Sequence, residues 1–184
     1  MRSQFFALTL LTVIAPVVLA AQGPAAPPTK GPVIADYGAA FVVPDPGLPT
    51  PMLQELKVRF DVSAAAADLR AVSRQLETAA RFLNMHAKAG VSPERLKVAI
   101  VVHGAAAKDV LSNDAYKRRH GIDNPNLPLL DALKRAGVRI YLCGQTAGSS
   151  GIVAADLAPP VQMALSAMTA HLVLNAEGYV LNPF

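Results

Sequence analysis

The sequence predicts one α/β domain with a parallel or mostly parallel sheet and helices on both faces. From about residue 55 onward, patterns typical of strands alternate with patterns typical of helices, which is the order expected of parallel strands joined by crossover helices. One segment, residues 97–103, is apolar almost throughout, as expected of a central strand that is covered on both faces. Glycines stand just past several of the helix patterns and mark their ends.

Composition supports a folded domain. Of the 184 residues, 52% are apolar and only 16% are charged, whereas disordered chains combine low hydrophobicity with high net charge. The formal net charge is +4, but the cations are scattered along the chain, so we expect no nucleic-acid binding. The densest cationic segment, residues 117–120, is interpreted as a solvated helix end or loop, with an anion-attracting rim as the alternative.

Residues 1–21 have the pattern of a secretory signal peptide. Arg2 precedes an apolar run over residues 5–18, and small residues follow at a suitable cleavage position. The run is shorter than the roughly 20 residues of a membrane-spanning helix, and it contains Pro16. Cleavage is therefore favoured over retention as an anchor. We expect a periplasmic or secreted protein without stable membrane insertion after cleavage.

The next segment, residues 22–54, is predicted to be a proline-rich extended arm. It contains eight of the 15 prolines, which exclude regular helix and interior strand, so part of it is expected to be disordered. Tyr37 and the apolar residues 41–43 interrupt the arm. They could dock on the domain or on a neighbouring subunit, and the sequence leaves both possibilities open.

The domain itself, residues 55–184, begins with a strand over residues 56–62. Apolar residues alternate with charged ones there, which is the period-two pattern of a strand with one wet face. An apolar stripe with spacings of three and four predicts a helix over residues 65–88, and Gly90 ends it. The strand over residues 97–103 follows and is expected to be central.

The remaining elements continue the alternation of strands and helices. Ser166 and Asn126 are the expected N-terminal caps of two of these helices. An alternative for the end of the chain is a hairpin over residues 171–181. In chain order, the sequence predicts a short helix over 105–111, a polar loop or broken helix over 112–125, a helix over 126–136, a strand over 138–143, a brief helix around 152–157, a strand over 161–165, a helix over 166–177 and a strand over 179–181.

Two strand ends carry the candidate site. His103 and Gly104 close the central strand, and Cys143 and Gly144 close the strand that follows it. Open α/β sheets bind ligands outside the carboxyl ends of their strands, and consecutive strands are usually neighbours. His103 and Cys143 are therefore expected to face each other, with glycine backbone amides able to approach a ligand closely.

Cys143 is the only cysteine, so the chain cannot form an internal disulfide. Loop amides and the start of the next helix would stabilise its thiolate, and a protonated His103 would act in the same direction. A buried, inert cysteine is the alternative. The four histidines show no metal-ligand spacing, so we expect no metal and no other cofactor.

Several of these segments recur together in a known family. They are the strand with Val58-Arg59-Phe60-Asp61, the long helix containing Asn84, the strand ending in His103-Gly104, the segment Leu142-Cys143-Gly144-Gln145 and the terminal Glu177-Gly178-Tyr179. None is diagnostic alone, but in order and spacing they resemble the DsrE/DsrF-like family over residues 55–183.

The resemblance implies a three-layer α/β/α domain with a five-stranded, mainly parallel sheet, assembled into trimers or hexamers. Some members of the family act in sulfur relay and carry sulfur as a cysteine persulfide. Cys143 falls where their sulfur-carrying cysteine would fall.

Two hypotheses follow for the function. In the first, the protein is a sulfur carrier or sulfurtransferase: Cys143 is the catalytic persulfide site, and the substrate-binding residues are His103, Gly104, Gly144 and Gln145. Its partners would be a sulfur donor or acceptor protein. In the second, the protein is a non-catalytic oligomer that binds a small ligand, and Cys143 is structural.

Overall fold

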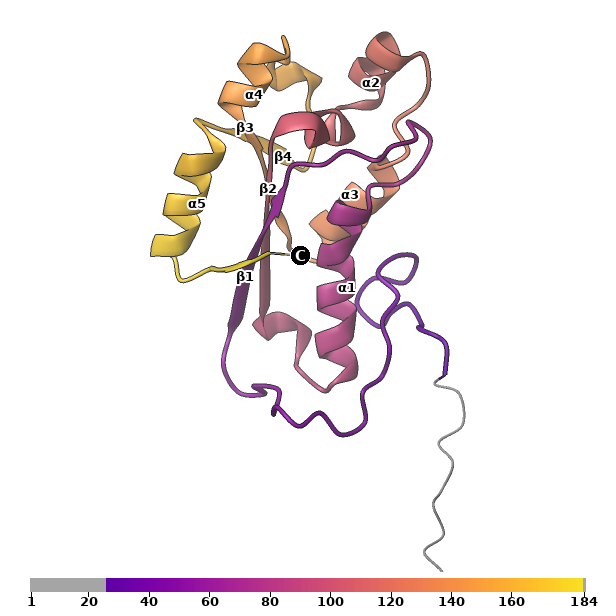
Figure 1. The fold of residues 1–184 in the computed structure, drawn as a ribbon, viewed down its shortest axis with the longest axis vertical. Helices are drawn as coiled ribbons and strands as arrows, with labels where there is room; N and C mark the ends of the chain where they lie inside the picture. The colour runs from indigo at the N-terminus through magenta and orange to yellow at the C-terminus, as the bar shows by residue number, and fades with distance from the viewer. Residues whose placement is uncertain (1–25, 184) are drawn as a thin grey trace, which may run out of the picture.

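The computed structural model describes residues 26–183, so the expected signal peptide, residues 1–21, lies outside the described residues. Within them, five strands form one sheet in the order β4-β3-β2-β1-β5, and every neighbouring pair is parallel (Figure 1). The strands are β1 (Leu56–Val62), β2 (Leu96–Val102), β3 (Arg139–Cys143), β4 (Val161–Ala164) and β5 (Val180–Asn182).

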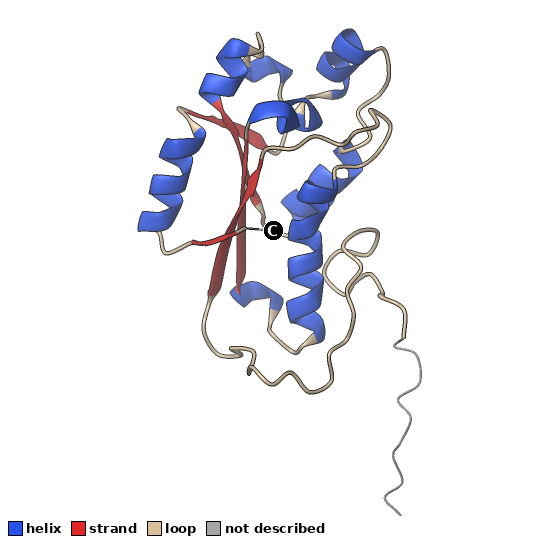
Figure 2. Ribbon diagram, viewed as in Figure 1, coloured by secondary structure: helices blue, strands red, loops and turns tan. Residues whose placement is uncertain are grey.

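Helices cover both faces of the sheet and make three layers, as Figure 2 shows. α1 (Arg74–Lys88) and α3 (Leu127–Arg135) pack on one face, and α5 (Ala167–Ala176) packs on the other. The shorter elements are α2 (Asn113–His120), α4 (Gly144–Ser149) and the 3₁₀ helices η1 (Pro93–Arg95), η2 (Gly104–Val110) and η3 (Ala154–Asp156). The predicted α/β class, the three layers and the five-stranded parallel sheet are therefore confirmed. No helix among residues 26–183 is long and apolar enough to cross a membrane.

The two faces of the sheet bury unequal cores. Alternate strand residues, including Phe60, Ile100 and Ile140, point into a large aliphatic core beneath α1 and α3. The opposite face has a smaller core, in which Val101 of β2 packs with Leu174 of α5. β2 is buried along nearly its whole length, as its apolar sequence predicts for a central strand.

The prediction that the charged residues of β1 face solvent is wrong at one position. Arg59 is 8% exposed because α5 and the segment after it cover this part of the sheet. The alternative hairpin over residues 171–181 is also excluded, because α5 precedes a short strand that pairs in parallel with β1.

Helix boundaries differ from the sequence prediction where side chains cap a helix. The helix expected over residues 65–88 begins only at Arg74, because the Ser73 hydroxyl accepts a hydrogen bond from the N–H of Leu76 at 3.4 Å. In the preceding loop, the Asp68 carboxylate accepts from the N–H of Arg70 at 2.8 Å, which is a turn rather than a helix.

The structure also defines the segments around the carboxyl edge of the sheet. Of the two possibilities for residues 112–125, a polar loop or a broken helix, the structure has a helix, α2, which Ser112 caps and Gly121 ends with a left-handed backbone (φ 76°). The brief helix expected around 152–157 is the 3₁₀ helix η3, and a six-residue helix that was not predicted, α4, lies before it, directly after β3. Asn126 precedes α3 as predicted, but its side-chain oxygen accepts from the N–H of Ser73 at 2.7 Å and does not cap α3.

The proline-rich segment packs on α1 over residues 29–40. Thr29 and Ala40 form an antiparallel bridge that closes this loop. Asn84 of α1, fully buried, accepts from two N–H groups of the loop at 2.9–3.0 Å and donates to three of its carbonyls at 2.9–3.1 Å. Gly38 has φ +69° and lies so close to α1 that a Cβ would overlap the helix backbone. Tyr37 packs on the domain, whereas residues 41–43 are exposed.

Candidate functional site

The ends of β2 and β3 lie side by side at the carboxyl edge of the sheet. Val102 pairs with Leu142 in the parallel register, and the next residues are His103 and Cys143. The strand ends stay together beyond this pair, because the N–H of Gly104 donates to the Thr146 hydroxyl of α4 at 3.2 Å. The structure therefore brings together the two strand ends that the sequence singled out.

The Cys143 side chain lies where α4 and α5 both begin. It is a free thiol and only 6% exposed. Burial opposes its ionisation, but hydrogen bonds from the N–H groups of Thr146, Ala167 and Gln145 and from the Thr146 hydroxyl outweigh burial and lower the pKa of the thiol below its ordinary value. These donors make the edge a site that can hold an anionic sulfur.

Gly144 allows the chain after β4 to approach this site. A Cβ at Gly144 would lie 2.6 Å from the carbonyl oxygen of Ala164 and 2.9 Å from that of Leu165, so any side chain would push the connection from β4 to α5 away. The Gln145 amide donates to the same Leu165 oxygen at 3.2 Å. Gly144 and Gln145 thus fix the connection that carries Ala167 to Cys143.

The His103 ring turns toward β1. Its Nε2 lies 3.0 Å and 3.2 Å from the two carboxylate oxygens of Asp61. The groups that lower the pKa of Cys143 are backbone amides and a hydroxyl, while His103 is engaged with a carboxylate on the strand at its other side. The structure thus gives the two strand-end residues different surroundings.

Sequence reasoning missed a chain of polar side chains that continues from His103. His171 of α5 lies with Nε2 2.9 Å from Asp61 Oδ1, and Arg59 Nε donates to His171 Nδ1 at 3.2 Å. Arg59 also donates to the Tyr179 carbonyl. Burial raises the pKa of Asp61, but the hydrogen bonds from His171 and His103 outweigh it, so this pKa lies below its ordinary value. Arg59 and Asp61 are two residues apart in β1 and therefore lie on the same face of the sheet. This spacing of an arginine and an aspartate in a strand is the sequence feature that could have indicated the polar chain.

The cationic segment 117–120 is the last turn of α2. Lys117 lies 3.2 Å from Asp123, Arg118 lies 2.6 Å from Asp156, and Arg119 donates to the carbonyls of Ser150 and Gly151. The two arginines therefore join α2 to the segment after α4. Among residues 26–183, no group of three or more histidine, cysteine or acidic side chains could hold a metal ion.

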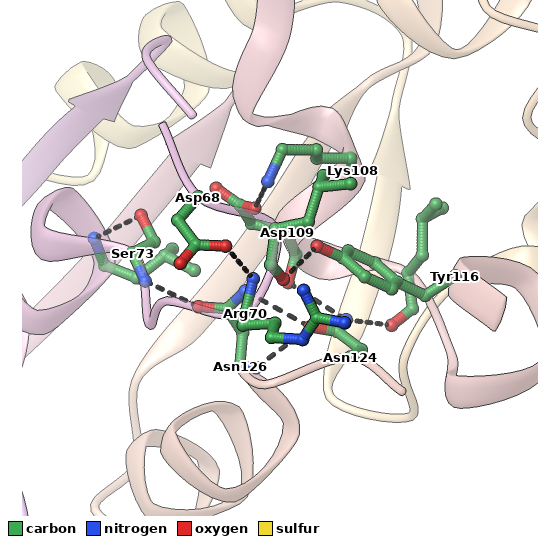
Figure 3. A network of polar contacts seen from close by, with 11 residues as sticks. Asp68, Arg70, Ser73, Lys108, Asp109, Tyr116, Asn124 and Asn126 are labelled. Carbon is green, nitrogen blue, oxygen red and sulfur yellow. Dashed lines mark hydrogen bonds and ion pairs between the residues drawn. The ribbon is translucent and has the colours of Figure 1, made fainter. Parts of the chain in front are cut away.

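A buried polar network fixes the scaffold behind this edge (Figure 3). Asp109 is fully buried and lies 2.6 Å from Lys108 Nζ, and burial raises the pKa of its carboxyl above the ordinary value. Asn124 donates to the Leu111 carbonyl at 2.7 Å and accepts from the Asn126 side chain at 3.1 Å. Together with the bond from Ser73 to Asn126, these contacts join the loop before α1, η2 and the start of α3.

The fold and the strand-end thiol define a class: three-layer α/β proteins with a parallel sheet and a cysteine at its carboxyl edge. Residues 60–183 match the model of the DsrE/DsrF-like family. This match spans more than half of the chain, so the protein belongs to the DsrE/DsrF-like family, as the resemblance of its segments indicated.

A comparison with solved structures supports the fold, and a comparison with curated proteins finds no match. The "Structure of Protein of Unknown Function MTH1491 from Methanobacterium thermoautotrophicum" is similar at a TM-score of 0.53 and 18% identity, over 71% of this chain and 100% of that one. At this identity the likeness concerns the fold alone. No curated protein matches the chain.

Proposed function

We propose that the protein is a sulfur carrier or sulfurtransferase that binds sulfur as a persulfide on Cys143. The observation that carries the proposal is the set of N–H and hydroxyl donors around this thiol. The thiolate is the nucleophile in sulfur chemistry, and the same donors suit the negative charge of a persulfide. Membership of the DsrE/DsrF-like family, some of whose members act in sulfur relay, supports the same role.

The loading step needs a donor with a sulfur–sulfur bond, such as thiosulfate. The Cys143 thiolate attacks the outer sulfur, a new bond forms between it and Sγ, and the bond to the sulfite group breaks. Sulfite leaves with the electron pair of that bond. The products are sulfite and a persulfide anion on Cys143, so atoms and charge balance without an added oxidant or reductant.

The second candidate is a non-catalytic oligomer that binds a small ligand. The low exposure of Cys143, 6%, favours this alternative, because a buried cysteine commonly serves only packing. The two candidates differ in whether the thiol reacts.

Intact-mass measurement separates them. After treatment with thiosulfate or polysulfide, the protein should gain the mass of one sulfur atom, and a reductant should remove it. The matched control is Cys143→Ser, which should gain nothing. A wild-type protein that takes up no reducible sulfur would exclude the carrier role and leave the ligand-binding candidate.

A further inference from the structure

A hydrogen-bonded chain of side chains from three elements begins at His103, at the end of the strand next to the one that ends in Cys143. Asp61 of β1 is its centre and contacts His103 at the end of β2 and His171 of α5. Arg59 lies two residues before Asp61 on the same face of β1. It is the last member of the chain and donates a hydrogen bond to His171. The proposed loading step starts from the Cys143 thiolate and needs no base, so it gives these four side chains no role.

The hydrogen-bond partners of His171 determine which of its ring nitrogens carries the proton. An arginine side chain can only donate, so His171 Nδ1 accepts from Arg59 Nε. His171 is therefore neutral and carries its proton on Nε2, which donates to Asp61 Oδ1 at 2.9 Å. Asp61 is an acceptor, and its pKa lies below the ordinary value.

Of the two ring nitrogens of His103, one is hydrogen-bonded to Asp61 and the other can accept a proton. Its Nε2 donates to Asp61 at 3.0 Å, and Nδ1 has no partner among residues 26–183. A carboxylate that orients an imidazole in this way leaves the other nitrogen as a base and stabilises the imidazolium that forms when it takes a proton. The side chain of His103 is 32% exposed, so a ligand can reach it, whereas Arg59 is buried.

The dyad of His103 and Asp61 is next to the sulfur site. His103 and Cys143 follow directly after the paired residues Val102 and Leu142, and neighbouring strands lie about 4.8 Å apart. Both residues continue the face of the sheet that carries Val101 and Tyr141 and that α5 covers. A molecule that approaches the outer sulfur of a persulfide on Cys143 therefore comes within the neighbourhood of His103.

We propose that His103, oriented by Asp61, takes the proton from the compound that receives sulfur from Cys143, and that this acceptor is a thiol. The inference rests on the proposed function of Cys143. His103 is the catalytic residue, since it contacts the acceptor, and Asp61 and His171 are positioning residues. A thiol has an ordinary pKa of about 8.5 and is mostly protonated at neutral pH, so a thiol acceptor needs a base.

The transfer step balances without a further reactant. The acceptor thiol gives its proton to His103 Nδ1, and its sulfur forms a bond to the outer sulfur of the persulfide. The bond between the two persulfide sulfurs breaks, and its electron pair goes to Sγ of Cys143. The acceptor leaves as a persulfide, and Cys143 returns to the thiolate that the surrounding N–H groups stabilise.

Comparing two acceptors tests the proposal. Protein loaded with sulfur from thiosulfate and freed of excess donor is mixed either with a thiol or with sulfite, and sulfur loss from Cys143 is followed by mass. Free cysteine and a reduced cysteine-containing peptide serve as the small and the polypeptide thiol. Sulfite at mildly alkaline pH already offers its electron pair, so its attack needs no base.

The variant His103→Gln can still bond to Asp61 but cannot take a proton. We expect it to transfer sulfur to thiols about 10²-fold more slowly at neutral pH, and to lose much less of its transfer to sulfite, because that step needs no base. The thiol defect should shrink at alkaline pH, where the acceptor is already a thiolate. Asp61→Asn should show a smaller defect of the same kind, and His86→Gln on α1 is the matched control for loss of a histidine.

The outcomes distinguish this inference from the proposed function. If wild-type protein takes up no sulfur, both fall together. If it loads sulfur but His103→Gln serves thiols as fast as wild type, or loses thiol and sulfite transfer equally, only the role of His103 is overturned. If His103→Gln does not load sulfur, the absence of alkaline rescue in Asp61→Asn overturns the inference and its presence supports it. A preference for one of the two thiols identifies the source of the acceptor.

Discussion

The environment of Cys143 is a balance between burial and hydrogen bonding. Burial favours the neutral thiol, whereas hydrogen bonds from N–H and O–H donors favour the thiolate. A hydrogen bond to a charged group contributes about 1.5–3 kcal/mol, and together the hydrogen bonds to this sulfur outweigh its burial. The residue is therefore both shielded and ionisable, which suits a carrier of reactive sulfur.

Thr146 offers a test of this balance at a single residue. Its hydroxyl accepts from the N–H of Gly104 at 3.2 Å and helps lower the pKa of Cys143. Thr146→Val keeps the branched shape and removes the hydroxyl, so we expect the thiol pKa to rise toward its ordinary value.

The measurement is the pH dependence of Cys143 alkylation by iodoacetamide. The control Thr146→Ser retains a hydroxyl and should keep the midpoint near that of the wild type. A Thr146→Val protein whose midpoint equals that of the wild type would contradict the role of this hydroxyl.

At the residue scale, the sequence was sufficient to place Cys143 and His103 but not to describe their surroundings. Apolar runs that end in His103-Gly104 and Cys143-Gly144 predict two neighbouring strand ends. The amide of Ala167 reaches Cys143 only because Gly144 lets a distant part of the chain approach. Such a contact depends on tertiary packing, which no local pattern contains.

At the scale of elements, the proline-rich segment is joined to α1 mainly by Asn84. This side chain is fully buried and makes five hydrogen bonds to the loop over residues 29–40. Lys88 adds bonds to Thr29 and to the Ala40 carbonyl. The loop thus extends the core beyond the family domain, since Ile34 within it is 3% exposed.

Replacing Asn84 should release this loop. Asn84→Ala leaves buried N–H and carbonyl groups without partners, each costing about 1–3 kcal/mol, so we expect the free energy of unfolding to fall by at least about 3 kcal/mol. Urea denaturation measures this loss, and limited proteolysis should show earlier cleavage within residues 29–40. Met85→Ala, on the exposed side of the same helix, is the control. Unchanged protease resistance in Asn84→Ala would contradict the proposed anchoring.

Element boundaries show what periodicity omits. The apolar spacing of three and four extends back to Leu69 and suggested a longer α1, but the Leu69 carbonyl accepts from the Tyr116 hydroxyl at 2.8 Å. Ser73 then begins the helix. Leu69 still packs against the core as predicted from its apolar character, although it does so from a loop.

For the whole molecule, we propose self-association through α5. The exposed side chains Leu165, Met168 and Leu172 are 72–74% exposed in the single chain and lie in or next to this helix. Exposed apolar groups that cluster in this way are typical of protein interfaces. A second copy of the chain is the partner that the expected trimer or hexamer requires.

Leu172→Glu tests the proposed assembly. It places a charge in the proposed interface, where burying an unpaired charge is strongly unfavourable, so we expect self-association to weaken at least about tenfold. Sedimentation velocity over a range of concentrations provides the measurement. Leu48→Glu, at an exposed position in the proline-rich segment, controls for the added charge. A monomeric wild type, or a Leu172→Glu protein with unchanged assembly, would exclude this interface.

The central claim is that a stabilised Cys143 thiolate takes up sulfur, and the pH dependence of sulfur loading tests it most directly. The rate at which thiosulfate adds one sulfur to the protein should follow the thiolate fraction and reach its plateau below the ordinary thiol pKa of about 8.5, with no loading of Cys143→Ser. A rate that rises only through the ordinary thiol range, or sulfur uptake by Cys143→Ser, would contradict the account.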